Sequence, residues 1–173
     1  MELRPEYLLP VISKTLQDVI LPVLDEQQQV AQEQLKLAIG FLNIMAQNGA
    51  MQFAFDADEL RRLTALAKAL SEIVEGNEAS TRAIAAAEAV CDNIGVDPAE
   101  IVAVTRQLRI GVSDLIAQGH AQGNMALDAT IFGLVNDFSR VQLDRDRAWV
   151  LPMGFEIGQD AVPPIASQLG LRD

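Results

Sequence analysis

His120 is the residue of this sequence best suited to acid–base chemistry. It lies between Gly119 and Gly123, and an imidazole can take up and release a proton near neutral pH. The simpler interpretation is a surface histidine at the end of a helix, where a positive charge interacts favourably with the helix dipole. We favour the simpler interpretation because no neighbouring motif supplies a nucleophile or an orienting acid. His120 is thus the candidate catalytic residue, with Asp114 or Asp128 as the carboxylate that an enzyme would need.

Cys91 is the single cysteine, and it follows an alanine-rich stretch typical of a helix. A thiol in such a setting usually acts as a small hydrophobic side chain. Its acidic neighbours Glu88 and Asp92 would disfavour the reactive thiolate, so we do not expect a catalytic cysteine. One cysteine and one histidine cannot build a zinc site, nor the paired Glu-x-x-His motifs of a di-iron bundle. A Mg²⁺ or Ca²⁺ site made of carboxylates alone stays open, but the sequence shows no EF-hand spacing. We predict no metal and no cofactor.

Two further patterns have simple structural interpretations. The spacing of Gly119 and Gly123 resembles a phosphate-binding turn, but Asn124 and Met125 follow where that motif requires lysine and serine or threonine. The acidic set Glu72, Glu75 and Glu78 is typical of a solvated helix end, because Gly76 interrupts the helical spacing.

Trp149 is the candidate residue for a ligand or an interface. Tryptophan is enriched at interface hot spots and in ligand pockets. Core filling is the more common role, and the sequence does not decide between the two.

Charge argues against several classes of partner. The 173 residues include 24 Asp and Glu against 13 Lys and Arg, which gives a formal net charge of −11. A surface that binds nucleic acid needs clustered basic residues, and the densest groups here are Arg61-Arg62 and Arg145-Asp146-Arg147. We expect no nucleic-acid partner, and the same charge would be repelled by an anionic membrane surface.

The apolar residues form neither a membrane span nor a signal peptide in the sequence pattern. No uninterrupted apolar run reaches the ~18 residues of a membrane span, and the first ten residues lack the pattern of a signal peptide. A single cysteine also fits a reducing compartment. We predict a cytoplasmic protein without membrane contact.

The elements that position these residues are helices. Apolar residues recur at helical spacing almost throughout, whereas strand alternation is rare. We predict an all-α, single-domain bundle of about six helices. The expected helices cover residues 5–21, 25–48, 56–75, 78–94, 98–118 and 124–148. Three of them begin at a capping motif: a capping box at Asp25/Gln28, a capping box at Asp56/Glu59, and a cap at Asp97 before Pro98.

The second predicted helix is apolar on nearly every side, with Leu35, Ile39, Phe41 and Met45 among its residues. A helix of that kind is usually buried, so we expect it to form the buried centre of the bundle. Its end at Asn48-Gly49 suits a left-handed stop.

A different kind of segment follows residue 148. Residues 149–173 are rich in proline and glycine but stay apolar. We expect this tail to lie in a groove, either of its own bundle (residues 1–148) or of a neighbouring subunit.

The opening stretch resembles a known family. The motif consists of Arg4-Pro5, Leu16 and the run Leu21–Asp25 before a long apolar helix. It resembles an uncharacterised family of small bacterial helical proteins. Members of that family tend to be encoded beside aminoglycoside-phosphotransferase-like kinases and acyl-CoA dehydrogenases. The likeness covers roughly the first 50 residues. The family usually carries a histidine and an arginine in its second helix, where this chain has Gln29–Gln32, so no functional residue is carried over. The resemblance implies an accessory role near acyl-CoA or kinase chemistry.

Three functions remain open at this point. The leading hypothesis is an accessory or protein-interaction bundle without enzymatic activity that self-associates, most simply as a homodimer. The alternative is a bundle that holds an apolar or acyl-like small molecule between its helices, where the alanine-rich fourth helix leaves space. The third is an enzyme that uses His120.

Overall fold

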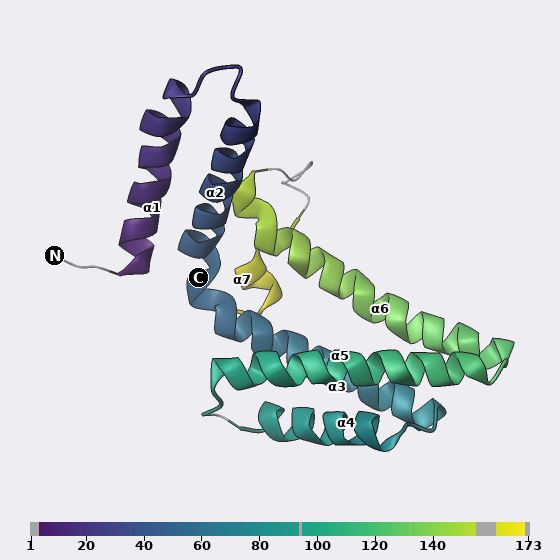
Figure 1. Ribbon diagram of the computed structural model, residues 1–173. Coiled ribbons are helices and arrows are strands. Elements are labelled where there is room, and N and C mark those ends of the chain that lie inside the picture. The colour runs from purple at the N-terminus through teal and green to yellow at the C-terminus, as the bar shows by residue number, and fades with distance from the viewer. Residues whose placement is uncertain (1–3, 94, 155–161, 172–173) are drawn as a thin grey trace. The chain divides into compact units, whose positions relative to one another are not determined.

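The fold is all-α, as predicted. The computed structural model describes residues 4–93, 95–154 and 162–171, and this part of the chain contains helices and turns but no strand (Figure 1). The elements are α1 (Pro5–Thr15), η1 (Leu16–Ile20), η2 (Leu21–Val23), α2 (Gln29–Asn48), η3 (Gly49–Met51), α3 (Gln52–Ile73), α4 (Glu78–Cys91), α5 (Pro98–Ala121), α6 (Met125–Val150), η4 (Leu151–Met153) and α7 (Ile165–Gln168).

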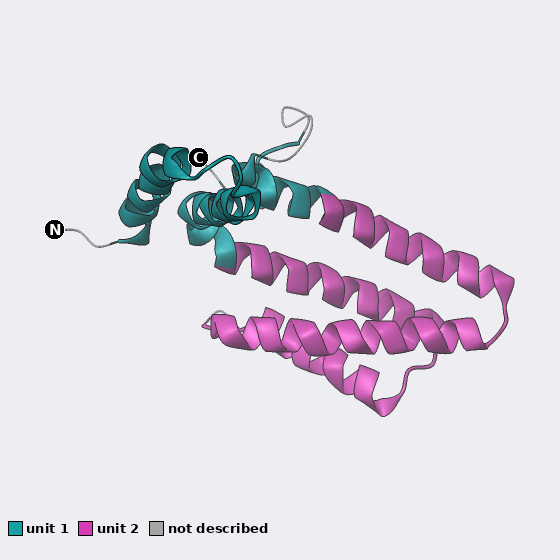
Figure 2. Ribbon diagram, turned by 45° about the horizontal axis from the view of Figure 1, so that its top comes forward, with its two compact units in different colours: residues 1–52, 144–173 teal, residues 53–143 magenta. Residues whose placement is uncertain are grey.

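The chain divides into two compact units, which Figure 2 shows in different colours. Unit 1 comprises residues 1–52 and 144–173, and unit 2 comprises residues 53–143. The boundaries fall at the start of α3 and inside α6. We expected residues 1–148 to form one bundle and residues 149–173 a tail.

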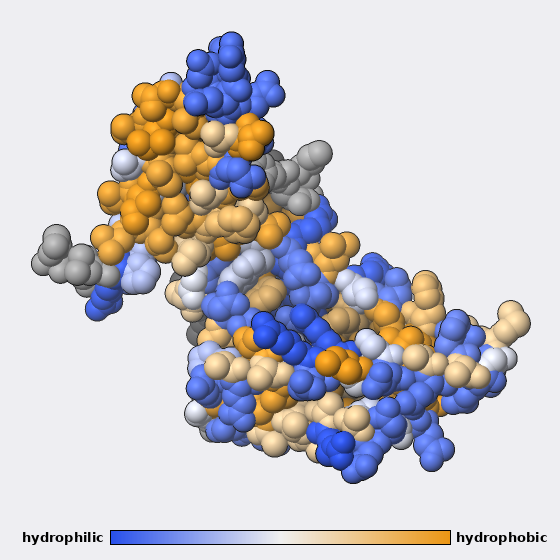
Figure 3. Space-filling model, viewed as in Figure 1, coloured by the Kyte–Doolittle hydropathy of each residue, from blue (hydrophilic) through white to orange (hydrophobic). Residues whose placement is uncertain are grey.

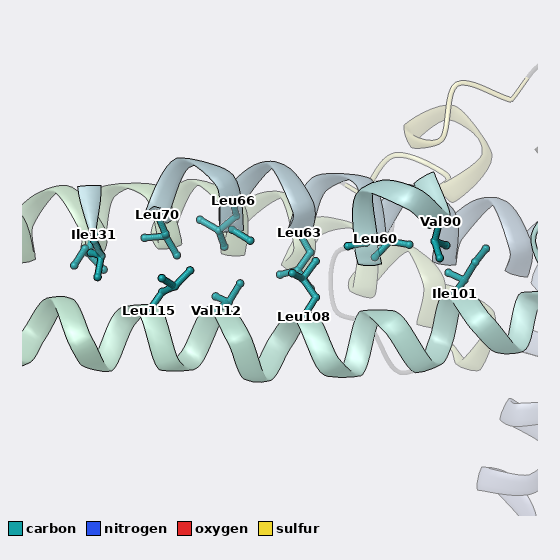
Figure 4. Packing of buried hydrophobic residues seen from close by; sticks show 13 residues of the cluster. Leu60, Leu63, Leu66, Leu70, Val90, Ile101, Leu108, Val112, Leu115 and Ile131 are labelled. Atoms are coloured by element: carbon teal, nitrogen blue, oxygen red, sulfur yellow. The ribbon is translucent and has the colours of Figure 1, made fainter. Parts of the chain in front are cut away.

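Unit 2 holds a closed aliphatic core between its helices. On α3, Leu60, Leu63, Leu66 and Leu70 recur at helical spacing and point toward α5 (Figure 4). The α5 residues that meet them, Ile101, Leu108, Val112 and Leu115, repeat at steps of seven, four and three. Such spacing keeps one stripe of each helix out of water, and the burial of these stripes stabilises the unit.

Two caps fix helix starts in unit 2. The Asp97 side chain accepts a hydrogen bond from the Ala99 amide at 2.8 Å, with Pro98 at the first helical position, as predicted. Asn77 caps α4 in the same way, because its Oδ1 accepts a hydrogen bond from the Ser80 amide at 2.8 Å. Each cap satisfies an amide that the helix itself leaves without a partner.

The predicted start of the third helix is wrong. α3 begins at Gln52, so Asp56 and Glu59 lie inside the helix and form no capping box. The residues between 52 and 56 are compatible with a helix, and the chain enters α3 directly from the turn η3. Gly49 also keeps a right-handed conformation with φ −55°, not the left-handed stop that we expected.

The predicted start of the second helix is displaced. Asp25 and Gln28 do form local hydrogen bonds. The Asp25 amide donates to Gln28 Oε1 at 3.1 Å, and Asp25 Oδ1 accepts from the Gln27 amide at 2.9 Å. These contacts close a turn ahead of α2, which begins at Gln29.

The expectation that the second helix is the buried centre of the bundle is also wrong. Only Ile39, Gly40 and Asn48 of α2 are buried. Phe41 and Met45 are each 58% exposed, because α1 and η4 pack on other sides of α2 and no described element of unit 1 covers these two side chains. The core of thirteen buried apolar residues lies in unit 2 instead.

The described part of the tail packs within unit 1. A Cβ added to Gly40 would lie 3.3 Å from Met153 Cε, so η4 sits closely against α2. Asn48 Nδ2 donates to the Trp149 carbonyl at 2.7 Å, and Arg145 Nη2 donates to the Gln168 carbonyl at 3.0 Å. The rest of the predicted tail, residues 155–161 and 172–173, lies outside the described residues.

Candidate functional site

His120 meets one of the two carboxylates proposed for it. Its Nδ1 lies 2.9 Å from Asp128 Oδ1. α5 extends to Ala121, beyond the predicted end at residue 118, so His120 is in its last turn, and Asp128 is in the first turn of α6. The loop between the helices is short enough to bring these two turns together.

The His120–Asp128 contact joins two helix ends. The histidine side chain is 79% exposed, and the cavities described below are lined by other residues. A histidine at a helix C-terminus and a carboxylate at a helix N-terminus each suit the local dipole. The role of His120 as a catalytic residue or as a charged group at a helix end therefore stays a prediction.

Cys91 is half-buried in unit 2, with its Sγ 3.9 Å from Thr64 Oγ1. It borders a cavity of about 180 Å³ together with Phe53, Leu60 and Ile101. The site is a gap at the edge of the apolar core, consistent with a thiol that packs as a small hydrophobic group.

Trp149 is half-buried near the end of α6. Its carbonyl accepts the hydrogen bond from Asn48, and its neighbours Ala148 and Leu151 line a cavity of about 430 Å³ in unit 1. The indole itself does not line that cavity. The role of Trp149 in binding a ligand or an interface stays a prediction.

An apolar groove in unit 2 lies between α3 and α6. Its volume is about 280 Å³, and its lining is Arg62, Ala65, Leu66, Ala69, Leu134, Phe138 and Val141. Arg62 stands out in this lining, because its guanidinium carbon is 5.5 Å from the centre of the Phe138 ring. The arrangement is a hydrophobic strip with one cationic group above an aromatic face.

Three groups hold the Arg62 side chain in place. Nε donates to Asp58 Oδ2 at 2.8 Å and Nη2 donates to Gln142 Oε1 at 2.7 Å. Nη1 is buried and has no hydrogen-bond partner among the described residues. From the sequence, Arg62 stands out only as half of a basic pair with Arg61. The signal for a groove was its i, i+4 spacing from Asp58 and to Leu66, which places a cation in an apolar stripe.

Another cavity of unit 2 is polar. Glu59, which is 8% exposed, pairs with Arg109 across α3 and α5. The cavity of about 180 Å³ beside this pair is also lined by Asp56 and Arg106. Two acids and two arginines balance one another, so this cavity has no net preference for an anion or a cation.

The α1–α2 hairpin of unit 1 exposes large apolar side chains. Val11 is 64% exposed and Val30 is 77% exposed, in addition to Phe41 and Met45. Figure 3 shows apolar surface over both helices. Contiguous apolar surface of this kind marks interaction sites in folded proteins. This surface was not predicted from the sequence, because we expected the apolar residues of α2 to lie in the interior.

Among the described residues, no group of three His, Cys, Asp or Glu side chains is placed to hold a metal ion. In the same part of the chain, none of the helices combines the length and the apolar character needed to cross a membrane.

The comparisons with known proteins give no information about function. No family model, curated protein or solved structure matches this chain. The resemblance of the first 50 or so residues to a family of bacterial helical proteins therefore stays a prediction.

Proposed function

We propose that this protein is an accessory or protein-interaction protein that self-associates, most simply as a homodimer. The observation that carries the proposal is the exposed apolar surface of the α1–α2 hairpin. Apolar surface left in water costs ~25 cal/mol per Å² relative to burial, and monomers rarely expose contiguous apolar patches above a few hundred Å². Association removes this surface from water.

The net charge disfavours one other class of partner, and the composition fits the proposed setting. A formal net charge of −11 makes phosphate-rich partners unfavourable, and the single cysteine suits a reducing, cytoplasmic setting. The resemblance of the opening residues implies an accessory role near acyl-CoA or kinase chemistry, which a self-associating protein without a chemical site could fill.

Native mass spectrometry of the purified chain tests self-association. We expect a mass of twice 18.8 kDa, and light scattering after size exclusion should give the same mass across a range of concentrations. A species of 18.8 kDa at every concentration contradicts the proposal.

A second candidate function is binding of an apolar or acyl-like molecule, and the groove between α3 and α6 is the observation that favours it. Small side chains at Ala65 and Ala69 open this groove. We expect Ala69→Phe to fill it and to abolish saturable binding of a fluorescent fatty-acyl probe. The control Ala103→Phe, on the exposed side of α5, should leave binding unchanged. The absence of saturable binding by the unmodified protein contradicts this function.

A further inference from the structure

We infer that the bare side of the α1–α2 hairpin binds the same side of a second copy of this chain, so that two hairpins close into an antiparallel four-helix bundle. This inference rests on the proposed self-association and assigns it a surface and a geometry. We call this surface the hairpin face. It consists of nine exposed side chains: Tyr7, Leu8, Val11, Ile12, Val19, Val30, Leu37, Phe41 and Met45.

The hairpin uses a different side to hold itself together. Ser13 Oγ donates to Asn43 Oδ1 at 2.7 Å between the two helices. Half-buried or buried residues continue this seam at helical spacing, with Leu9 and Leu16 beside Ser13 on the first helix and Ile39 and Leu42 on α2. These residues are engaged within one chain and are separate from the hairpin face.

A further side of α2 is occupied by the tail. Gly40 lies against Met153, and its missing side chain permits this approach. With α1 on one side and η4 on another, the stripe formed by Val30, Leu37 and Phe41 stays exposed, and no described element of unit 1 covers it. Met45 extends this stripe, since the four residues follow at steps of seven, four and four.

The first helix and its continuation carry a matching stripe. Leu8, Ile12 and Val19 follow at steps of four and seven, and Val11 and Tyr7 widen the stripe. Figure 3 shows that apolar surface covers both helices on one side of the hairpin. The two stripes together provide the apolar surface that we propose a second hairpin covers.

The size of the hairpin face matches a dimer interface. From the exposed fractions of its nine side chains, we estimate an accessible area on the order of 800 Å², and a standard interface buries ~800 Å² on each partner. A small ligand would cover only part of such an area. A second copy supplies an equal area of the same character.

Charge favours a second copy over a partner of opposite charge. None of the nine side chains is charged, although the chain as a whole carries −11. Charged side chains elsewhere on the hairpin form ion pairs, Arg4 with Glu6 at 3.8 Å, Lys14 with Asp18 at 2.6 Å and Lys36 with Glu33 at 3.1 Å. A two-fold axis can place this face against itself without opposing like charges, whereas a basic partner would find no acid among the nine side chains.

The hairpin also lacks a core that two helices could form alone. Ser13, a polar residue, is the one buried residue of α1. Unit 2 encloses its thirteen-residue core with helices on several sides. Two hairpins packed face to face reach the four-helix arrangement in which apolar stripes are enclosed, with helices crossing at roughly 20°.

Two substitutions to glutamate test the assignment, with a matched control. Phe41→Glu and Val11→Glu place a charge in the hairpin face, and Phe132→Glu makes the same change at a side chain of unit 2 that is 72% exposed. All three positions are exposed, so the helices should persist, which circular dichroism checks. We expect either hairpin variant to raise the dissociation constant of the dimer at least ~30-fold, and Phe132→Glu to change it by less than about threefold.

The outcomes separate the inference from the proposed function. Dimers that resist both hairpin substitutions overturn the inference but leave self-association intact, and dissociation by Phe132→Glu alone would move the interface to unit 2. An unmodified chain that stays at 18.8 kDa overturns the proposed function and the inference together. Loss of the dimer in Phe41→Glu and Val11→Glu, with Phe132→Glu unaffected, is the expected result.

Discussion

At the scale of single residues, Arg62 and Arg61 offer a test of how much one partly buried cation contributes. Arg62 contacts Asp58, Gln142 and the Phe138 ring, whereas Arg61 is 67% exposed and lies 3.7 Å from the same Asp58. We expect Arg62→Ala to lower the free energy of unfolding by about 1–2 kcal/mol, because it removes packing as well as charge. Arg61→Ala should stay within ~0.5 kcal/mol. Urea unfolding of both variants measures the difference, and equal effects would show that the groove contacts contribute nothing.

The sequence could predict which residues were chemically distinctive but not always what surrounds them. His120 and Asp128 were named together, and they do meet, since helix ends joined by a short loop are neighbours whatever the rest of the fold does. Arg62 was missed because its environment comes from α6, whose residues are about seventy positions later in the chain. Local spacing carries no information about that contact.

At the scale of elements, two glycines in helices should respond in opposite ways to alanine. A Cβ on Gly119 of α5 would overlap Ile131 Cδ1 and lie 3.0 Å from Val74 Cγ2, while a Cβ on Gly133 of α6 would meet nothing. Alanine favours a helix by ~1 kcal/mol over glycine. We expect Gly133→Ala to raise the unfolding temperature and Gly119→Ala to lower it, because crowding by ~1–3 kcal/mol outweighs the gain. Thermal unfolding followed by circular dichroism decides, and stabilisation by Gly119→Ala would show that Ile131 moves aside freely.

The helical character of the chain and the cap at Asp97 could be predicted from the sequence, but the exposure of α2 could not. Periodicity shows which side of a helix is apolar and leaves open what covers that side. Leu35 and Ile39 turn toward the chain's own elements, whereas Phe41 and Met45 remain exposed. The assumption that apolar residues on every side must be enclosed by the same chain led to the wrong centre.

At the scale of the whole molecule, net charge and apolar surface act against each other in self-association. Each copy carries a formal net charge of −11, so two copies repel each other as they approach. Salt screens this repulsion, with a screening length of ~10 Å at 0.1 M. The hairpin face has no charged side chain whose attraction salt could weaken. We therefore expect the dimer to tighten as sodium chloride rises from about 0.05 M to about 0.5 M, measured by sedimentation equilibrium. A dimer that loosens with salt would mean that ion pairs hold it together, which an apolar contact between two hairpin faces does not provide.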